Sequence, residues 1–173
     1  MNTCTLEEPI EVSTSYSKTF LSIGELIISD KPTQIWTVLG SCVSIVLHNP
    51  RKKVSALCHA QLTEKEIFGE SGSDLFTKKA VKDDFRYVAS SINYMLDKMQ
   101  SMGINKNEIQ ASVYGGASII EKFTYQIGLE NANAACSVLE KHGIRVIKKD
   151  IGGGKSRTIR HYSDTGITQV RAL

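Results

Sequence analysis

A thiol, an imidazole and a hydroxyl lie close together in one stretch of the chain, TVLGSCVSIVLHNPRKKVSALCHAQL, residues 37–62. Cys42 follows a Gly-Ser pair, and His59 lies further along the same stretch. An isolated cysteine, with a pKa near ~8.5, is only slightly ionised at neutral pH. A neighbouring imidazole can remove the thiol proton and later return it to a leaving group. The two residue types therefore predict covalent hydrolysis by a thiolate.

The residues before Cys42 fit the same chemistry. Gly40 and Ser41 are expected to form a tight turn whose backbone N–H groups hold an oxyanion. Thr37 is a candidate to orient the imidazole, as the third member of a catalytic triad does. We take Cys42 as the candidate nucleophile, His59 as its base and Thr37 as the orienting residue. We expect no metal and no cofactor.

The segment between Cys42 and His59 has the pattern of a β-hairpin. Apolar residues alternate on both sides of HNPRKK (residues 48–53), which is a strong turn signal. A four-residue loop over 49–52 would place Cys42 directly opposite His59, with β-carbons about 5 Å apart. A slip of two residues would keep both on the same face but separate them diagonally.

Three other interpretations remain open from the residues alone. A cysteine in a hairpin is more often structural, because free cysteine is a common core residue, and we interpret Cys58 and Cys136 in this way. A metal site of Cys42, His48, Cys58 and His59 is a weaker option, because His48 would lie about 20 Å from Cys42 along the strand. An exposed Cys42 of low pKa would also suit a redox sensor.

The composition is that of an ordinary globular protein of 173 residues, with 41% hydrophobic and 23% charged residues. The net charge of +3 and the dispersed basic residues argue against nucleic-acid binding. No apolar run approaches the ~18 residues of a membrane span, and the N-terminus lacks a signal pattern. We therefore expect a cytoplasmic protein without membrane insertion, whose four cysteines are free thiols.

Strands and helices in mixed order are expected to position these residues. Residues 1–17 are interpreted as a disordered tail, and residues 18–173 as a single catalytic domain containing a long loop over 63–83. Helical spacing predicts one helix from Asp84 to about Gly103 and a second over Asn131–His142. Besides the hairpin, strands are expected at 20–29, 34–39, 109–116, 144–150, 157–162 and 167–172. This order predicts an α/β (α+β) layered sandwich with mixed, largely antiparallel sheets.

Several short motifs occur in an order that resembles one known family. They are Ile23-Gly24-Glu25, TVLGSCVSIVLHNP, ALCHAQL, Arg86-Tyr87, YGGAS (114–118), IGLEN (127–131) and DIGGGKSR (150–157). Over residues 20–172 the chain resembles the CheD family, the chemoreceptor glutamine deamidases of bacterial and archaeal chemotaxis. The resemblance implies a Cys–His–Thr site on a layered sandwich similar to that of the cytotoxic necrotizing factor toxins.

The resemblance also implies the roles of particular residues. It identifies Cys42 as the nucleophile, His59 as the base and Thr37 as the orienting residue. Candidates for the side that faces substrate or partner come from the YGGAS motif, and they are Gly115, Gly116 and Ser118.

The implied substrate is a set of glutamine side chains on the cytoplasmic helices of methyl-accepting chemotaxis receptors. These side chains would become glutamates, with release of ammonia through a cysteine thioester. A CheC-type phosphatase is the partner that the resemblance implies. The chain departs from the family pattern at Glu130, at Gly154-Lys155 and just after His59. These differences bear on partner contacts and substrate choice rather than on the chemistry. A non-catalytic adaptor that binds receptors or CheC is the alternative function.

Overall fold

A computed structural model describes residues 15–63, 85–118 and 127–173. The strands in this part of the chain are β1 (Ser17–Phe20), β2 (Leu26–Ser29), β3 (Thr33–Leu39), β4 (Val43–Asn49), β5 (Val54–Ala60), β6 (Gln110–Gly115), β7 (Arg145–Ile151), β8 (Arg157–Tyr162) and β9 (Thr168–Ala172). The helices are α2 (Val88–Ser101), α3 (Ile127–Lys141) and the short 3₁₀ helix η1 (Lys106–Glu108).

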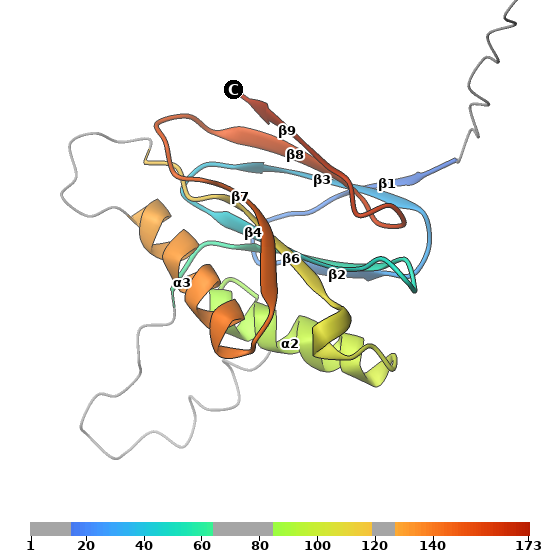
Figure 1. The fold of residues 1–173 in the computed structure, drawn as a ribbon. Helices are drawn as coiled ribbons and strands as arrows, with labels where there is room; N and C mark the ends of the chain where they lie inside the picture. Colours follow the sequence, from blue (N-terminus) through green and yellow to red (C-terminus); the bar gives the residue numbers. More distant parts are fainter. Residues whose placement is uncertain (1–14, 64–84, 119–126) are drawn as a thin grey trace, which may run out of the picture.

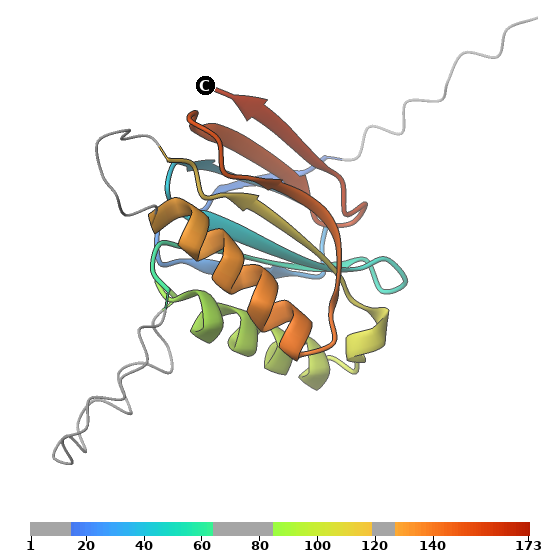
Figure 2. The ribbon, with the colours of Figure 1, turned by 60° about the vertical axis from the view of Figure 1, so that its left-hand side comes forward.

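The described elements form three layers (Figures 1 and 2). A four-stranded sheet, in the order β1-β3-β8-β9, lies over a five-stranded sheet, in the order β2-β5-β4-β6-β7. Helices α2 and α3 cover the outer face of the five-stranded sheet. Strands β1 and β3 are parallel, as are β6 and β7, whereas the other pairs are antiparallel. The predicted layered sandwich with mixed, largely antiparallel sheets is confirmed.

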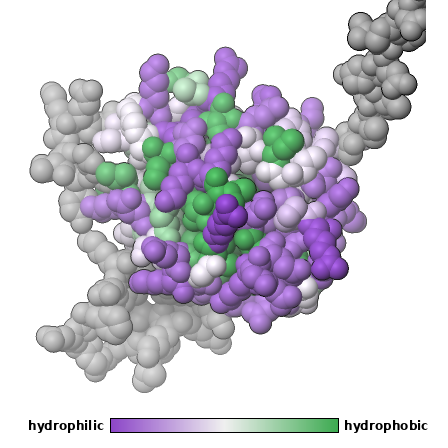
Figure 3. Space-filling view, viewed as in Figure 1, coloured by the Kyte–Doolittle hydropathy of each residue, from purple (hydrophilic) through white to green (hydrophobic). Residues whose placement is uncertain are grey.

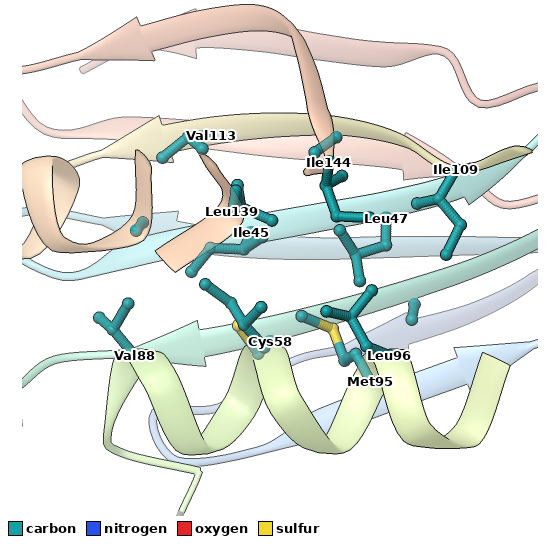
Figure 4. Packing of buried hydrophobic residues seen from close by; sticks show 14 of the residues in the cluster. Ile45, Leu47, Cys58, Val88, Met95, Leu96, Ile109, Val113, Leu139 and Ile144 are labelled. Carbon is teal, nitrogen blue, oxygen red and sulfur yellow. The ribbon is translucent and has the colours of Figure 1, made fainter. Parts of the chain in front are cut away.

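One apolar core fills the space between the helices and the five-stranded sheet. Helix α2 contributes the predicted stripe, in which Ile92, Met95 and Met99 are fully buried. The stripe forms because apolar residues at a spacing of three and four lie on one face of a helix. Figure 4 shows this face packed against Cys58 and Leu47 of the sheet. Each fully buried side chain of this size contributes about 1.5–3 kcal/mol.

A second, smaller core lies between the two sheets. Its buried members are Leu21, Ile35, Leu39, Val46, Leu57, Tyr114 and Ile159. In β3 the buried and exposed positions alternate, because one face of this strand meets the other sheet and the opposite face meets solvent. Thr37 lies on the buried face, and the strand therefore directs its hydroxyl between the sheets.

The β4–β5 hairpin has a different register from the one expected. Asn49 pairs with Val54, so the loop covers residues 50–53 rather than 49–52. The side chain of Asn49 accepts a hydrogen bond from the N–H of Lys52 (2.7 Å), and Lys53 closes the loop in a left-handed conformation (φ 55°). Consequently Ser44, and not Cys42, lies directly opposite His59.

The sequence-based boundaries were wrong in three further places. Helix α2 begins at Val88, four residues after the expected start. Residues 20–29 form no single strand, because β1 ends at Phe20 in one sheet and β2 begins at Leu26 in the other. Helix α3 begins at Ile127 rather than at Asn131. The expected long loop lies almost entirely outside the described residues, as does most of the expected N-terminal tail, although Ser17 already begins β1.

The surface is polar over most of the face in Figure 3, with its largest hydrophobic area near the centre and smaller ones around it. Among the described residues, no helix is long and apolar enough to cross a membrane.

Candidate active site

The candidate residues come from both sheets. Thr37 lies in β3 of the four-stranded sheet, and His59 lies near the end of β5 in the five-stranded sheet. Residues 40–42 form the turn that leads from β3 into β4, and so connect the two sheets. Cys42 is partly buried and packs against the inter-sheet core. The site is therefore assembled at one end of the space between the sheets.

Hydrogen bonds to Thr37 fix the tautomer of His59. The Thr37 hydroxyl donates to the carbonyl oxygen of Leu21 (2.7 Å) and lies 2.8 Å from His59 Nδ1. Because its one proton is used on the carbonyl, the hydroxyl must accept from Nδ1–H. The Leu21 carbonyl, 3.3 Å from Nδ1, is also only an acceptor. His59 therefore carries its proton on Nδ1 and keeps the lone pair on Nε2.

The lone pair of His59 Nε2 lies in a buried position. Among the described residues, neither Nε2 nor the hydroxyl of the facing Ser44 has a hydrogen-bond partner. Buried polar atoms without partners are uncommon and call for an explanation. An unpaired imidazole nitrogen is what a general base requires.

Cys42 lies diagonally from His59. The ladder ends with Val43 opposite Ala60, so Cys42 lies two positions beyond the Ser44–His59 pair and on the same face. Diagonal neighbours have α-carbons about 7–8 Å apart, which long and ring-bearing side chains can span. The expected direct pairing of Cys42 with His59 was wrong, whereas the shared face is present.

Burial keeps the thiol and the imidazole neutral. It raises the pKa of the Cys42 thiol, against a smaller lowering by the residue's own backbone N–H. Burial also lowers the pKa of His59, although the Leu21 carbonyl and Glu25 oppose this change. The two groups are accordingly a neutral thiol and a neutral imidazole, rather than a preformed ion pair. A raised pKa also disfavours the interpretation of Cys42 as a redox sensor, which needs a thiolate.

Three successive carbonyl groups of the Cys42 turn are held by the rest of the protein. The oxygen of Gly40 accepts from Ala117 N–H (2.8 Å), and the oxygen of Cys42 accepts from Gly116 N–H (2.8 Å). The oxygen of Ser41 accepts from the side-chain amide of Asn131 (3.2 Å). Among the described residues, no other residue accepts a hydrogen bond from the N–H groups of Ser41 and Cys42, although the Cys42 N–H also interacts with the residue's own thiol. Their role as oxyanion donors stays a prediction.

The YGGAS glycines support this turn through their backbone. A β-carbon at Gly115 (φ 102°) would lie 2.3 Å from the Cys42 carbonyl oxygen. One at Gly116 (φ 67°) would lie 2.5 Å from the oxygen of Gly128 in α3. Ser118 N–H donates to the carbonyl of Gly153, in the DIGGGKSR segment (2.8 Å). These contacts give the glycines a packing role, and a substrate contact at Gly115, Gly116 or Ser118 stays a prediction.

The four side chains of the alternative metal site do not converge. Cys58 points to the helices, where it is fully buried in the larger core. His59 points to the opposite face of the same sheet, toward Thr37. His48 lies at the other end of β4 from Cys42. Cys42, Cys58 and Cys136 are all free thiols, as predicted, and Cys136 is only partly buried.

Two polar residues at the site were missed from the sequence. Ser44 reads as an ordinary polar position in an apolar strand, and its neighbour across the ladder depends on the register. Asn131 was placed at a helix start, where asparagine is common, although it lies inside α3 and reaches the turn from there. Its place in the IGLEN motif was the available signal.

Comparison with known proteins places this architecture in a family. A family model described as CheD chemotactic sensory transduction matches residues 71–172, more than half of the chain. The protein named "Probable chemoreceptor glutamine deamidase CheD 2" of Geobacter sulfurreducens is 32% identical, with 89% of each chain covered. The chain belongs to the CheD family.

Other members of the CheD family are similar over most of this chain. The "Chemoreceptor glutamine deamidase CheD" of Thermotoga maritima is 30% identical, over 90% of this chain and 92% of its own. The crystal structure of the Bacillus licheniformis hypothetical protein YfiH has a TM-score of 0.45 and 13% identity, over 74% of this chain and 49% of that chain. This structural similarity is too weak to carry an argument. Membership in the CheD family therefore rests on sequence.

Proposed function

We propose that this protein is a chemoreceptor glutamine deamidase in which Cys42 is the nucleophile and His59 the general base. Its membership in the CheD family and the similarity to proteins named as chemoreceptor glutamine deamidases support the activity. The geometry of His59 supports the assignment of roles, because Thr37 holds Nδ1 and leaves the lone pair of Nε2 unused. The reaction converts a receptor glutamine and water into glutamate and ammonia.

In the first half of the reaction, His59 Nε2 takes the proton of the Cys42 thiol as sulfur attacks the side-chain amide carbon. The carbonyl oxygen becomes an oxyanion, and the N–H groups of Ser41 and Cys42 are its proposed donors. The imidazolium then donates its proton to the leaving nitrogen. Ammonia departs and a thioester with Cys42 remains.

In the second half, His59 removes a proton from water as that water attacks the thioester carbonyl. The second tetrahedral intermediate collapses, the carbon–sulfur bond breaks, and the proton returns to Cys42. The products are the receptor glutamate and the free thiol. Thr37 holds the ring in one tautomer throughout, so that the same nitrogen serves both halves.

The substrate proposed here is a glutamine on the cytoplasmic part of a chemotaxis receptor. The names of the related proteins support this substrate. A CheC-type phosphatase is the proposed partner, which the resemblance to the CheD family implies. The intact Cys–His–Thr arrangement favours an enzyme over a non-catalytic adaptor, because an adaptor needs no imidazole with an unpaired nitrogen.

The nucleophile is tested with Cys42→Ala. Purified receptor cytoplasmic fragment is incubated with enzyme, and each glutamine-to-glutamate change is detected by mass spectrometry alongside released ammonia. We expect deamidation by the wild-type protein and none above background by the variant, which lacks the attacking sulfur. The Cys136→Ala variant is the matched control and should keep wild-type turnover. Equal rates for Cys42→Ala and wild type would reject the nucleophile, and stoichiometric binding without ammonia release by the wild type would favour the adaptor.

A further inference from the structure

The side chain of Asn131 connects the two segments that carry the proposed nucleophile and base. Its amide nitrogen donates to the carbonyl of Ser41 (3.2 Å), just before Cys42, and to the carbonyl of Gln61 (2.8 Å), just after the end of β5. Asn131 is 1% exposed. Both hydrogens of one buried amide are thus used on two strand ends that are far apart in the sequence.

Close backbone packing puts Asn131 in this position. A β-carbon at Gly128, on the preceding turn of α3, would lie 2.5 Å from the carbonyl oxygen of Ala117 and 2.6 Å from that of Gly116. Helix α3 therefore contacts the strand end backbone to backbone. Residues three apart on a helix lie on neighbouring positions of one face, so Asn131 follows Gly128 toward the Cys42 turn.

The hydrogen bond to Ser41 also sets the direction of the next N–H group. In a planar trans peptide the C=O and the following N–H point in opposite directions. Because the Ser41 carbonyl points to Asn131 in the protein body, the N–H of Cys42 points the other way. The Gly40 carbonyl, bonded to Ala117, orients the Ser41 N–H in the same manner.

We propose that Asn131 is a positioning residue for the reaction. It directs the Cys42 N–H at the developing oxyanion, and it fixes the separation between the Cys42 turn and the end of the strand that carries His59. Asn131 touches neither substrate nor a reacting atom. This role rests on the deamidase function proposed above, and it assigns to the IGLEN motif a task at the active site.

Two substitutions of similar size separate positioning from packing. Asn131→Asp keeps the shape but replaces both donors by a charged oxygen that faces two carbonyls. Asn131→Leu keeps the volume and removes the polar atoms. We expect kcat for receptor-fragment deamidation to fall roughly 10- to 100-fold in both, with KM within about threefold, because a misdirected donor weakens the bond made in the transition state. Asn133→Ala, an exposed position on the same helix, should match wild type.

A second readout needs no receptor. The rate of Cys42 alkylation by iodoacetamide is followed against pH by peptide mapping, with the fully buried Cys58 as an internal report of unfolding. The profile of Cys42 should move to higher pH in both variants, because the thiol is less well placed beside His59. The proposal would be overturned by variants in which Cys58 stays unreactive, the pH profile of Cys42 alkylation equals that of wild type, and kcat is within twofold of wild type. Wild-type protein that releases no ammonia would reject the deamidase function, and the alkylation profiles would still test the position of the thiol.

Hydrogen exchange of the wild-type protein tests the same geometry without any substitution, and so it holds even if both variants unfold. The amides of Gly116 and Ala117, which donate to the turn, should be protected. The amides of Ser41 and Cys42 should exchange much faster. Protection of these two amides equal to that of Gly116 would show that they point into the protein, and it would overturn the proposal.

Discussion

Two histidine sites are buried between the sheets, one at each end, and they differ in how their ring nitrogens are used. At the candidate active site, His59 bonds through Nδ1 and leaves Nε2 without a partner among the described residues. At the other site, His161 lies 2.9 Å from the Thr168 hydroxyl through Nδ1 and 2.8 Å from the Ser55 hydroxyl through Nε2. His161 has no unused nitrogen.

The hydroxyl of Ser55 explains why the second site is complete. It donates to the carbonyl of Ser163 (2.7 Å), so it must accept from the rings of His161 and His48. Burial and the nearby His48 lower the pKa of His161 to about 3. This ring stays neutral and bonded on both sides, as a structural histidine does.

The comparison shows that burial does not distinguish a structural histidine from the one proposed as the general base. Both rings are neutral and both lie beside hydroxyl groups. The difference is one unpaired nitrogen on His59, which is a cost to stability that a purely structural site would avoid.

The largest expected effect comes from removing each ring in turn. His59→Ala should lower deamidation by about a thousandfold or more, because the thiol loses its base, while unfolding free energy changes modestly. His161→Ala should do the reverse, with a loss of about 2–4 kcal/mol of stability and near-normal turnover per folded molecule. Urea denaturation and ammonia release measure the two effects. If the effects on stability and turnover were exchanged between the variants, the contrast between the sites would be wrong.

The next effect comes from the residue that holds the His59 ring. Thr37→Val keeps the shape but removes the hydroxyl between Nδ1 and the Leu21 carbonyl. We expect turnover to fall roughly ten- to a thousandfold, because the ring is free to rotate or to change tautomer. Turnover within twofold of wild type, with His59→Ala inactive, would remove the hydroxyl from the mechanism and leave the Cys–His pair.

The smallest effect is a pH dependence of stability. The pKa of His161 is about 3 in the folded protein, against 6.5 for the free side chain, so below about pH 6.5 the unfolded chain binds a proton that the folded protein does not. The contribution of His161 to the free energy of unfolding is fully present above about pH 6.5. It falls as the pH decreases, by up to about 1.4 kcal/mol per pH unit. His48, whose pKa is also lowered, acts in the same direction, while Asp164 favours the charged ring.

Urea midpoints measured from about pH 8 down to about pH 5 check this slope. His161→Gln removes one of these titrating groups and should reduce the slope, leaving the part that His48 contributes. A slope that is the same in wild type and in this variant would show that His161 does not carry it.

Much of the fold could be predicted from the sequence. The bounds of β8 were confirmed as Arg157–Tyr162, because the alternation there follows the two faces of the sheet. The stripe of α2 was confirmed for the same kind of local reason. Local patterns did not predict the register of the β4–β5 hairpin, because a side-chain hydrogen bond within the loop determined it. Asn49 pairs with Val54 and so displaces the four-residue loop by one position, which shifts the partner of every residue in the hairpin by two.

The reacting residues of the candidate site could be predicted, but the groups that position them could not. Residue types and the family resemblance selected Cys42, His59 and Thr37, and the structure brings the last two into contact. The tautomer that leaves a lone pair on Nε2 depends on the Leu21 carbonyl, a backbone group that no side-chain pattern reveals. The role of Asn131 depends on a contact between segments ninety residues apart in the chain.

The backbone contact between Gly116 and Gly128 has a consequence for how such sequences can diverge. A side chain at either position would push α3 away from the strand end, and the amide of Asn131 would move with it. Gly116, Gly128 and Asn131 are therefore expected to be selected together. Selection for the two glycines should persist only while the hydrogen bonds of Asn131 are needed. Across related sequences, loss of either glycine should be accompanied by free variation at the position of Asn131.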